Sequence, residues 1–205
     1  MKQQIIVISG GDCFNTQEEF LAYLKVAPLD FESYKSDRRS WKSNLQEILG
    51  EEYEVIIPTM PNKQNAKYEE WKIWFEKFIP YINNEVILIG HSLGGIFLTK
   101  YLSENNFPKT ISGLFLVAAP FDDKDSEYKL ADFVLAGNLS KVESRAKNIF
   151  IYHSQDDSVV PFTDLGKYSK ALPAACCKIF TDRGHFIDES FPELVEDIKS
   201  LQRKS

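Results

Sequence analysis

Ser92 is the residue whose surroundings most clearly predict chemistry. It is the central serine of the Gly-x-Ser-x-Gly segment at residues 90–94, which follows the unbroken apolar run 86–89 and precedes an apolar stretch of helical length. A buried strand, a sharp turn and a helix in this order form a nucleophile elbow, which presents a serine hydroxyl at the end of a sheet. The alternative is an ordinary strand-to-helix turn in which the serine caps the helix. We predict that Ser92 is a nucleophile that attacks a carbonyl carbon.

The residues around Ser92 suit such a turn. A serine in this position is held in a strained backbone conformation, and side chains at Gly90 and Gly94 would collide with the neighbouring strand and helix. The N–H of Leu93 lies close to the N-terminus of the following helix, where backbone N–H groups and the helix dipole favour negative charge. We therefore expect the Leu93 amide to stabilise the oxyanion that develops during acyl transfer.

A serine hydroxyl needs a base to remove its proton, and an imidazole near neutral pH suits that role. The chain has three histidines, His91, His153 and His185. In chains built on a nucleophile elbow the order is serine, then acid, then histidine, and only His185 follows the last predicted strand. Gly184 gives the preceding turn the freedom to aim the imidazole at the elbow. We predict that His185 is the general base; the alternative is an exposed loop histidine.

The acid that orients the histidine must follow a strand end between Ser92 and His185. Asp156 and Asp157 both do so, directly after the predicted strand 148–153. A carboxylate at this point would accept the far N–H of His185, fix its tautomer and stabilise the imidazolium. Spacing alone does not choose between the two aspartates. The unused one is expected to shape the loop through hydrogen bonds to the backbone.

These side chains must be positioned by strands that end at one rim of a sheet. Six buried-type apolar runs alternate with helical patterns, which predicts a three-layer α/β/α sandwich around a mostly parallel six-stranded sheet. The runs occupy residues 5–8, 53–58, 86–89, 111–119, 148–153 and 176–180. Helices are expected at residues 16–24, 41–49, 68–78 and 191–201, in addition to the helix after Ser92. No repeat or linker divides the chain, so we expect residues 1–205 to form one domain.

Loops at the same rim supply further candidates. In this architecture the loop after an early strand provides a second oxyanion donor, and we assign it to the Gly11 N–H; the alternative is a plain tight turn. Met60 and Tyr68 follow the second strand, beyond the end where ligands of open α/β sheets bind. Together with Asp12 and His91 they are candidate walls of a substrate pocket, although the aromatic stripe that contains Tyr68 is also typical of a core helix face.

The insert at residues 121–147 begins acidic and polar and then turns amphipathic at Leu130, Phe133, Val134 and Leu135. Two interpretations remain open. The insert is either a small lid over the site or a surface helix.

Composition excludes several classes of protein. The net charge of −6 argues against a nucleic-acid surface, which would show as a basic stripe. No apolar stretch is long enough for a membrane span, and the N-terminus lacks the features of a secretory signal. The three cysteines are neither a disulfide framework nor a zinc site. We expect a cytoplasmic protein, a monomer or weak dimer, that binds a small acyl substrate and needs no metal or organic cofactor.

Three segments together carry a family resemblance. Residues 90–95, the Asp157-x-x-Val160-Pro161 segment and Gly184-His185-Phe186 resemble the small α/β-hydrolase family that includes retinoblastoma-binding protein nine and its bacterial relatives. The similarity extends over nearly the whole chain. It implies that the aspartate ahead of x-x-Val-Pro is the acid, which selects Asp157. Family members usually show His-Gly where this chain has Ser9-Gly10.

The resemblance and the residues agree on one chemistry, acyl transfer with Ser92, His185 and Asp157 in the order nucleophile, base and orienting acid. A carboxylic ester of a small acyl group is the expected test substrate, with a thioester or peptide bond as alternatives. The hypothesis from a different class is a catalytically silent scaffold that serves as a protein-interaction module, because fold and function separate readily.

Overall fold

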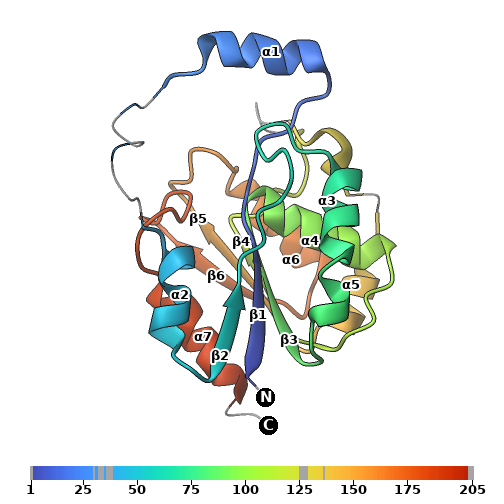
Figure 1. The fold of residues 1–205 in the computed structure, drawn as a ribbon, viewed down its shortest axis with the longest axis vertical. Coiled ribbons are helices and arrows are strands. Elements are labelled where there is room, and N and C mark those ends of the chain that lie inside the picture. The colour runs from blue at the N-terminus through green and yellow to red at the C-terminus, as the bar shows by residue number, and fades with distance from the viewer. Residues whose placement is uncertain are drawn as a thin grey trace.

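A six-stranded sheet with every strand parallel forms the centre of the molecule, as a computed structural model describes it for residues 2–29, 31, 35, 39–124, 129–135 and 137–202. The strand order is β2-β1-β3-β4-β5-β6 (Figure 1). The six strands are β1 (Gln3–Ile8), β2 (Tyr53–Ile56), β3 (Val86–His91), β4 (Ile111–Val117), β5 (Ile149–Ser154) and β6 (Cys176–Phe180). All six predicted strands are confirmed, with bounds that differ by a few residues.

Alternation along β1 shows how one strand supplies both faces of the sheet. Ile5 and Val7 point into one apolar cluster, while Ile6 and Ile8 point into the other, because successive strand side chains lie on opposite sides. All four are fully buried. Because both faces of the sheet are buried, side chains on either side of a strand are apolar, and the strand sequences are unbroken apolar runs.

Helices cover both faces, which confirms the three-layer prediction. The helices α2 (Trp41–Leu49) and α7 (Pro192–Gln202) pack on one face, and α3 (Tyr68–Glu76), α4 (Leu93–Glu104), α5 (Ser140–Arg145) and α6 (Thr163–Ala171) lie on the other (Figure 1). The α2 face uses Trp41, Leu45 and Leu49, all buried, at the helical spacing read from the sequence. The sequence analysis did not name α5 or α6.

The first helix, α1 (Gln17–Val26), extends two residues beyond its predicted end and lies apart from the sheet at the top of Figure 1. Thr16 caps it by accepting a hydrogen bond from the Glu19 N–H at 3.1 Å, as the capping-box pattern predicts. None of its residues is buried. Part of the predicted loop 27–40 lies outside the described residues.

The insert at residues 121–147 contains a 3-10 turn (Ala131–Phe133) and the short helix α5, so it is not a single surface helix. Leu130 and Phe133 are fully buried, and the Phe133 ring packs edge-on against Trp71 of α3 with centroids 5.3 Å apart. Their amphipathic spacing therefore reflects core packing. Residues 125–128 and 136 of the insert lie outside the described part.

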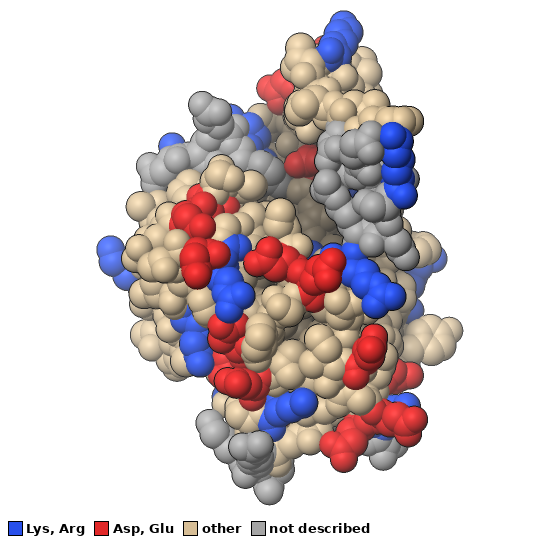
Figure 2. Space-filling view, turned by 90° about the vertical axis from the view of Figure 1, so that its left-hand side faces the viewer, with Lys and Arg blue, Asp and Glu red and all other residues tan. Residues whose placement is uncertain are grey.

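The surface carries charged side chains of both signs. On the face drawn in Figure 2, Lys and Arg side chains are interspersed with Asp and Glu. No helix among the described residues is long and apolar enough to cross a membrane. Cys13, Cys176 and Cys177 are free thiols.

Candidate active site

The turn between β3 and α4 has the strained conformation predicted for an elbow. Ser92 has φ of 55° and ψ of −128°, a combination that non-glycine residues rarely adopt. Its N–H donates to the Val117 carbonyl of β4 at 2.9 Å. A Cβ built on Gly90 would lie 2.5 Å from the Gly94 carbonyl oxygen, and one built on Gly94 would collide with the Ile8 carbonyl. Close packing of strand, turn and helix therefore requires both glycines.

The loop after β1 lies directly against Ser92. A Cβ added at Gly10 would lie 2.8 Å from the Ser92 Cβ and 3.2 Å from its Oγ. The next residues are held by the loop after β2, because the Asp12 N–H donates to the Lys63 carbonyl at 2.8 Å. Gly11 packs against that same Lys63 carbonyl, where a side chain would not fit. The two-glycine loop thus brings its backbone close to the predicted nucleophile.

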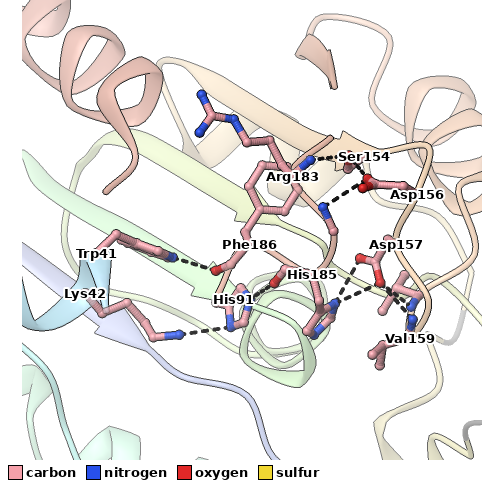
Figure 3. Close-up of polar contacts among 12 residues, drawn as sticks. Trp41, Lys42, His91, Ser154, Asp156, Asp157, Val159, Arg183, His185 and Phe186 are labelled. Carbon is pink, nitrogen blue, oxygen red and sulfur yellow. Dashed lines mark hydrogen bonds and ion pairs between the residues drawn. The ribbon is translucent and has the colours of Figure 1, made fainter. Parts of the chain in front are cut away.

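Of the two aspartates after β5, Asp157 is the one that contacts His185. The His185 Nδ1 lies 2.9 Å from Oδ2 and 3.1 Å from Oδ1 of Asp157 (Figure 3). The Asp157 side chain is fully buried, and its Oδ1 also accepts the N–H groups of Val159 and Val160 at 2.8 and 3.0 Å. With Nδ1 donating to the carboxylate, a neutral imidazole presents the lone pair of Nε2 for a proton.

Asp156 has a different task. Its carboxylate accepts the Gly184 N–H at 2.9 Å and the Ser154 hydroxyl, and the Ser154 Oγ accepts the Arg183 N–H at 3.1 Å (Figure 3). The hydrogen bond from Ser154 holds the pKa of Asp156 below its ordinary value. Gly184 has φ of 48°, a left-handed conformation that glycine adopts readily. Asp156 therefore fastens the loop that carries His185 to the end of β5.

The same loop is fastened from the other side by α2 and β3. The Trp41 Nε1 donates to the Phe186 carbonyl at 2.8 Å, and His91 Nε2 lies 2.8 Å from the His185 carbonyl oxygen. Because a carbonyl oxygen only accepts, Nε2 of His91 carries the proton and Nδ1 has a lone pair. Lys42 Nζ donates to that Nδ1 at 3.2 Å (Figure 3). The imidazole rings of His91 and His185 have centroids 4.9 Å apart.

Burial shifts the pKa values of His91, Lys42 and Asp12. The pKa of His91 lies well below its ordinary value, chiefly because the ring is buried and also because Lys42 and His185 are nearby. Burial, with the charge of Lys63, lowers the pKa of Lys42 to about 8. Burial raises the pKa of Asp12. His91 is thus a neutral hydrogen-bonding group at neutral pH.

One cavity of about 510 Å³ joins these segments. Both Ser92 and His185 line it, and so do Gly11, Asp12 and His91 of the sequence-predicted site. The other lining residues are Ser9, Gly10, Lys42, Lys63, Gln64 and Val159. A cavity of this size falls in the range of small-molecule sites.

Met60 and Tyr68 do not line that cavity. Met60 is buried and lines a neighbouring cavity of about 180 Å³, which shares Ser9, Gly10 and Lys63 with the larger one. Tyr68 is buried in the aromatic cluster of α3 and α4, with its ring centroid 5.9 Å from that of Phe97. The position of Tyr68 in the aromatic stripe therefore reflects core packing, which is the second of the two interpretations of the sequence.

Lys42 and Lys63 are charged residues of the cavity that the sequence did not indicate. Lys42 follows Trp41 at the start of a predicted helix, and Lys63 lies in a polar loop. No pattern in the chain indicated that both segments approach the elbow. The tertiary contact between the start of α2 and the loop after β6 brings Lys42 there, through hydrogen bonds such as Trp41 N–H to the Asp188 carbonyl at 2.9 Å.

Comparison with known proteins identifies the family to which the sequence is similar. A family model described as "Serine hydrolase" matches residues 33–203. The serine hydrolase RBBP9 of Rattus norvegicus is 28% identical over 162 residues, which cover 78% of this chain and 83% of the rat protein.

Solved structures show the same fold. The ydeN gene product of B. subtilis superposes with a TM-score of 0.74 at 19% identity and covers 98% of this chain and 100% of its own. Est1E from Butyrivibrio proteoclasticus, solved with ferulic acid bound, has a TM-score of 0.60 at 14% identity, with coverage of 99% and 89%. The all-parallel sheet with its elbow is therefore the α/β-hydrolase fold.

Proposed function

The chain belongs to the serine hydrolase family, and from that premise we propose that it cleaves a small carboxylic ester through an acyl-enzyme formed on Ser92. The observation that carries this proposal is the convergence of Ser92 and His185 on one cavity, with His185 hydrogen-bonded to Asp157. Ser92 lies in the turn between β3 and α4, Asp157 in the loop after β5 and His185 in the loop after β6. This placement after three strand ends supports the proposal.

In the proposed reaction the Ser92 hydroxyl attacks the ester carbonyl while Nε2 of His185 takes its proton. The resulting imidazolium is stabilised by Asp157, which accepts the Nδ1–H at 2.9 Å. His185 then gives the proton to the leaving alcohol, and the acyl group remains on Ser92. Water, deprotonated by the same imidazole, attacks the acyl-enzyme and releases the acid.

Two backbone amides are proposed to stabilise the oxyanion of each tetrahedral intermediate. Leu93 opens α4 immediately after Ser92, where a helix N-terminus favours negative charge. Gly11 lines the cavity in the loop that approaches Ser92. Removing one such donor typically lowers kcat by about 10²–10³.

An ester is the proposed substrate class, with a thioester or amide as chemically related alternatives that use the same acyl-enzyme. The fold neighbour Est1E, solved with ferulic acid bound, supports an ester as the first compound to try. A series of p-nitrophenyl esters that differ only in the length of the acyl chain would determine which length the enzyme prefers.

The test is the rate of p-nitrophenol release by the wild type, Ser92→Ala and Ser144→Ala. Ser144 is exposed on α5, outside the cavity, and serves as the matched control. We expect Ser92→Ala to lower kcat by about 10⁴–10⁶ and Ser144→Ala to match the wild type. A folded wild type that hydrolyses no ester, thioester or amide faster than Ser92→Ala would favour the interaction-module alternative.

A further inference from the structure

Two lysines line the cavity that contains Ser92. Lys42 comes from the first turn of α2 and Lys63 from the loop after β2. The other ionisable groups that line the cavity are Asp12, His91 and His185. His91 is neutral, as its hydrogen bonds require, and His185 is paired with Asp157. Lys42 and Lys63 are therefore the cationic groups of the cavity, and Asp12 and the Asp157 carboxylate behind His185 are the anionic ones.

Within the part of the chain that the structure describes, no ion pair involves Lys42 or Lys63. Lys42 is half-buried, and its Nζ donates to the neutral Nδ1 of His91 at 3.2 Å and lies 5.3 Å from the centre of the Trp41 ring. Partly buried ammonium groups are ordinarily compensated by a negative group. Among the described residues, no carboxylate pairs with Lys42.

Both lysines are tied to the reaction centre. Lys42 contacts His91, the residue before Ser92. The backbone of Lys63 accepts the Asp12 N–H at 2.8 Å and packs against Gly11, next to the glycine that touches Ser92. In Figure 3 the Lys42 amine lies on the opposite side of His91 from Asp157 and Val159. A negative group bound there would lie in the same cavity as the carbonyl attacked by Ser92.

We propose that the substrate is an ester that carries a second, anionic group, a carboxylate, which binds between Lys42 and Lys63. This inference rests on the proposed function and names its substrate class. Lys42 is the half-buried cation of the two, whereas Lys63 is exposed. One carboxylate supplies the single negative charge that would compensate the half-buried ammonium, whereas a phosphate monoester brings about two negative charges at neutral pH. The two lysines lie close enough to interact, because the charge of Lys63 contributes to lowering the pKa of Lys42. A single anionic group can therefore bind near both.

The experiment compares carboxylates with uncharged carboxamides of the same shape. Half-esters of straight-chain dicarboxylic acids of increasing length place the carboxylate on the acyl side, and esters of hydroxy acids place it on the leaving-group side. Each is paired with the compound in which the free carboxylate is a carboxamide. We expect kcat/KM for the best carboxylate to exceed that of its carboxamide by about 10- to 100-fold, the range of a charged hydrogen bond.

Variants assign the preference to the lysines. Lys42→Met and Lys63→Met keep the aliphatic stem and remove the charge, and each is expected to reduce the carboxylate-to-carboxamide ratio about 10-fold. Lys63 is exposed, so its variant remains informative if Lys42→Met disturbs folding. The matched control is Lys141→Met, at an exposed position on α5 outside the cavity, which should leave the ratio unchanged. Above about pH 8 the wild-type ratio should fall as Lys42 loses its proton.

The two possible failures are distinguishable. A wild type that hydrolyses the carboxamide esters as fast as the carboxylates in both series overturns the inference and leaves the proposed esterase intact. A ratio that survives in both lysine variants also overturns it. If no compound is hydrolysed and Ser92 does not react with a fluorophosphonate, the proposed function fails, and the inference fails with it.

Discussion

The Nε2 atom of His91 lies 2.8 Å from the carbonyl oxygen of His185, so the residue next to the predicted nucleophile holds the backbone of the predicted base. Ser92 and His91 share one strand end, and their spacing is fixed by the chain. This hydrogen bond therefore fixes the position of the loop after β6 relative to the elbow. On this geometry His91 is a positioning residue.

His91→Leu should lower kcat by about 100-fold with a much smaller change in KM, because misplacing His185 impairs proton transfer more than substrate binding. His91→Gln should recover much of the loss, since its amide N–H can donate to the same carbonyl. Steady-state kinetics of both variants on one ester provide the test. Equal losses in the two variants, or a loss confined to KM, would show that His91 does not act through His185.

The two aspartates should differ sharply. Asp157→Asn removes the charge that stabilises the His185 imidazolium and disturbs its tautomer, so kcat should fall by about 10⁴. Asp156→Asn keeps an oxygen that can accept from Gly184 and Ser154, and its loss should be about 10-fold or less. Ester hydrolysis by the two variants at one pH ranks them. The reverse ranking would overturn the assignment of Asp157.

Gly10→Ala tests the close approach of the β1 loop to Ser92. The added Cβ would lie 2.8 Å from the Ser92 Cβ, so we expect activity to fall by about 100-fold. Gly166→Ala in α6 is the matched control, because its Cβ would meet nothing within 4 Å and alanine favours a helix. Activity and thermal unfolding should be measured for both. Full activity of Gly10→Ala would contradict the geometry described for this loop.

His153 makes folding sensitive to acid. Burial lowers its pKa from 6.5 to about 4, so the unfolded chain binds a proton before the folded one does. The free energy of unfolding should therefore decrease as pH falls from about 6.5 to 4, by up to about 3 kcal/mol from this group.

The amide of glutamine binds no proton in this pH range. The variant His153→Gln should therefore lose less stability than the wild type over the same pH interval. Denaturant unfolding at several pH values measures both slopes. Identical slopes would show that His153 does not contribute to acid sensitivity.

The sequence predicted the strands and the elbow because these depend on local patterns. Apolar runs identify strands buried on both faces, and the glycines at 90 and 94 are required by contacts within one strand–turn–helix unit. The pairing of His185 with Asp157, rather than Asp156, came from family resemblance.

Other features depend on contacts between distant segments. Tyr68 and Phe133 share a pattern that fits a pocket, a lid or a core, and only their packing on α3 and α4 decides for the core. Lys42 reaches the cavity because the start of α2 packs on the loop after β6. No periodicity in the chain encodes that contact.

The most direct measurement of the central claim is reaction with a fluorophosphonate followed by mass spectrometry of the digested protein. We predict a single adduct on Ser92, formed by the wild type, absent from Ser92→Ala and formed much more slowly by His185→Ala. A folded wild type that remains unmodified, or an adduct on a different residue, would contradict the assignment of Ser92 as the nucleophile.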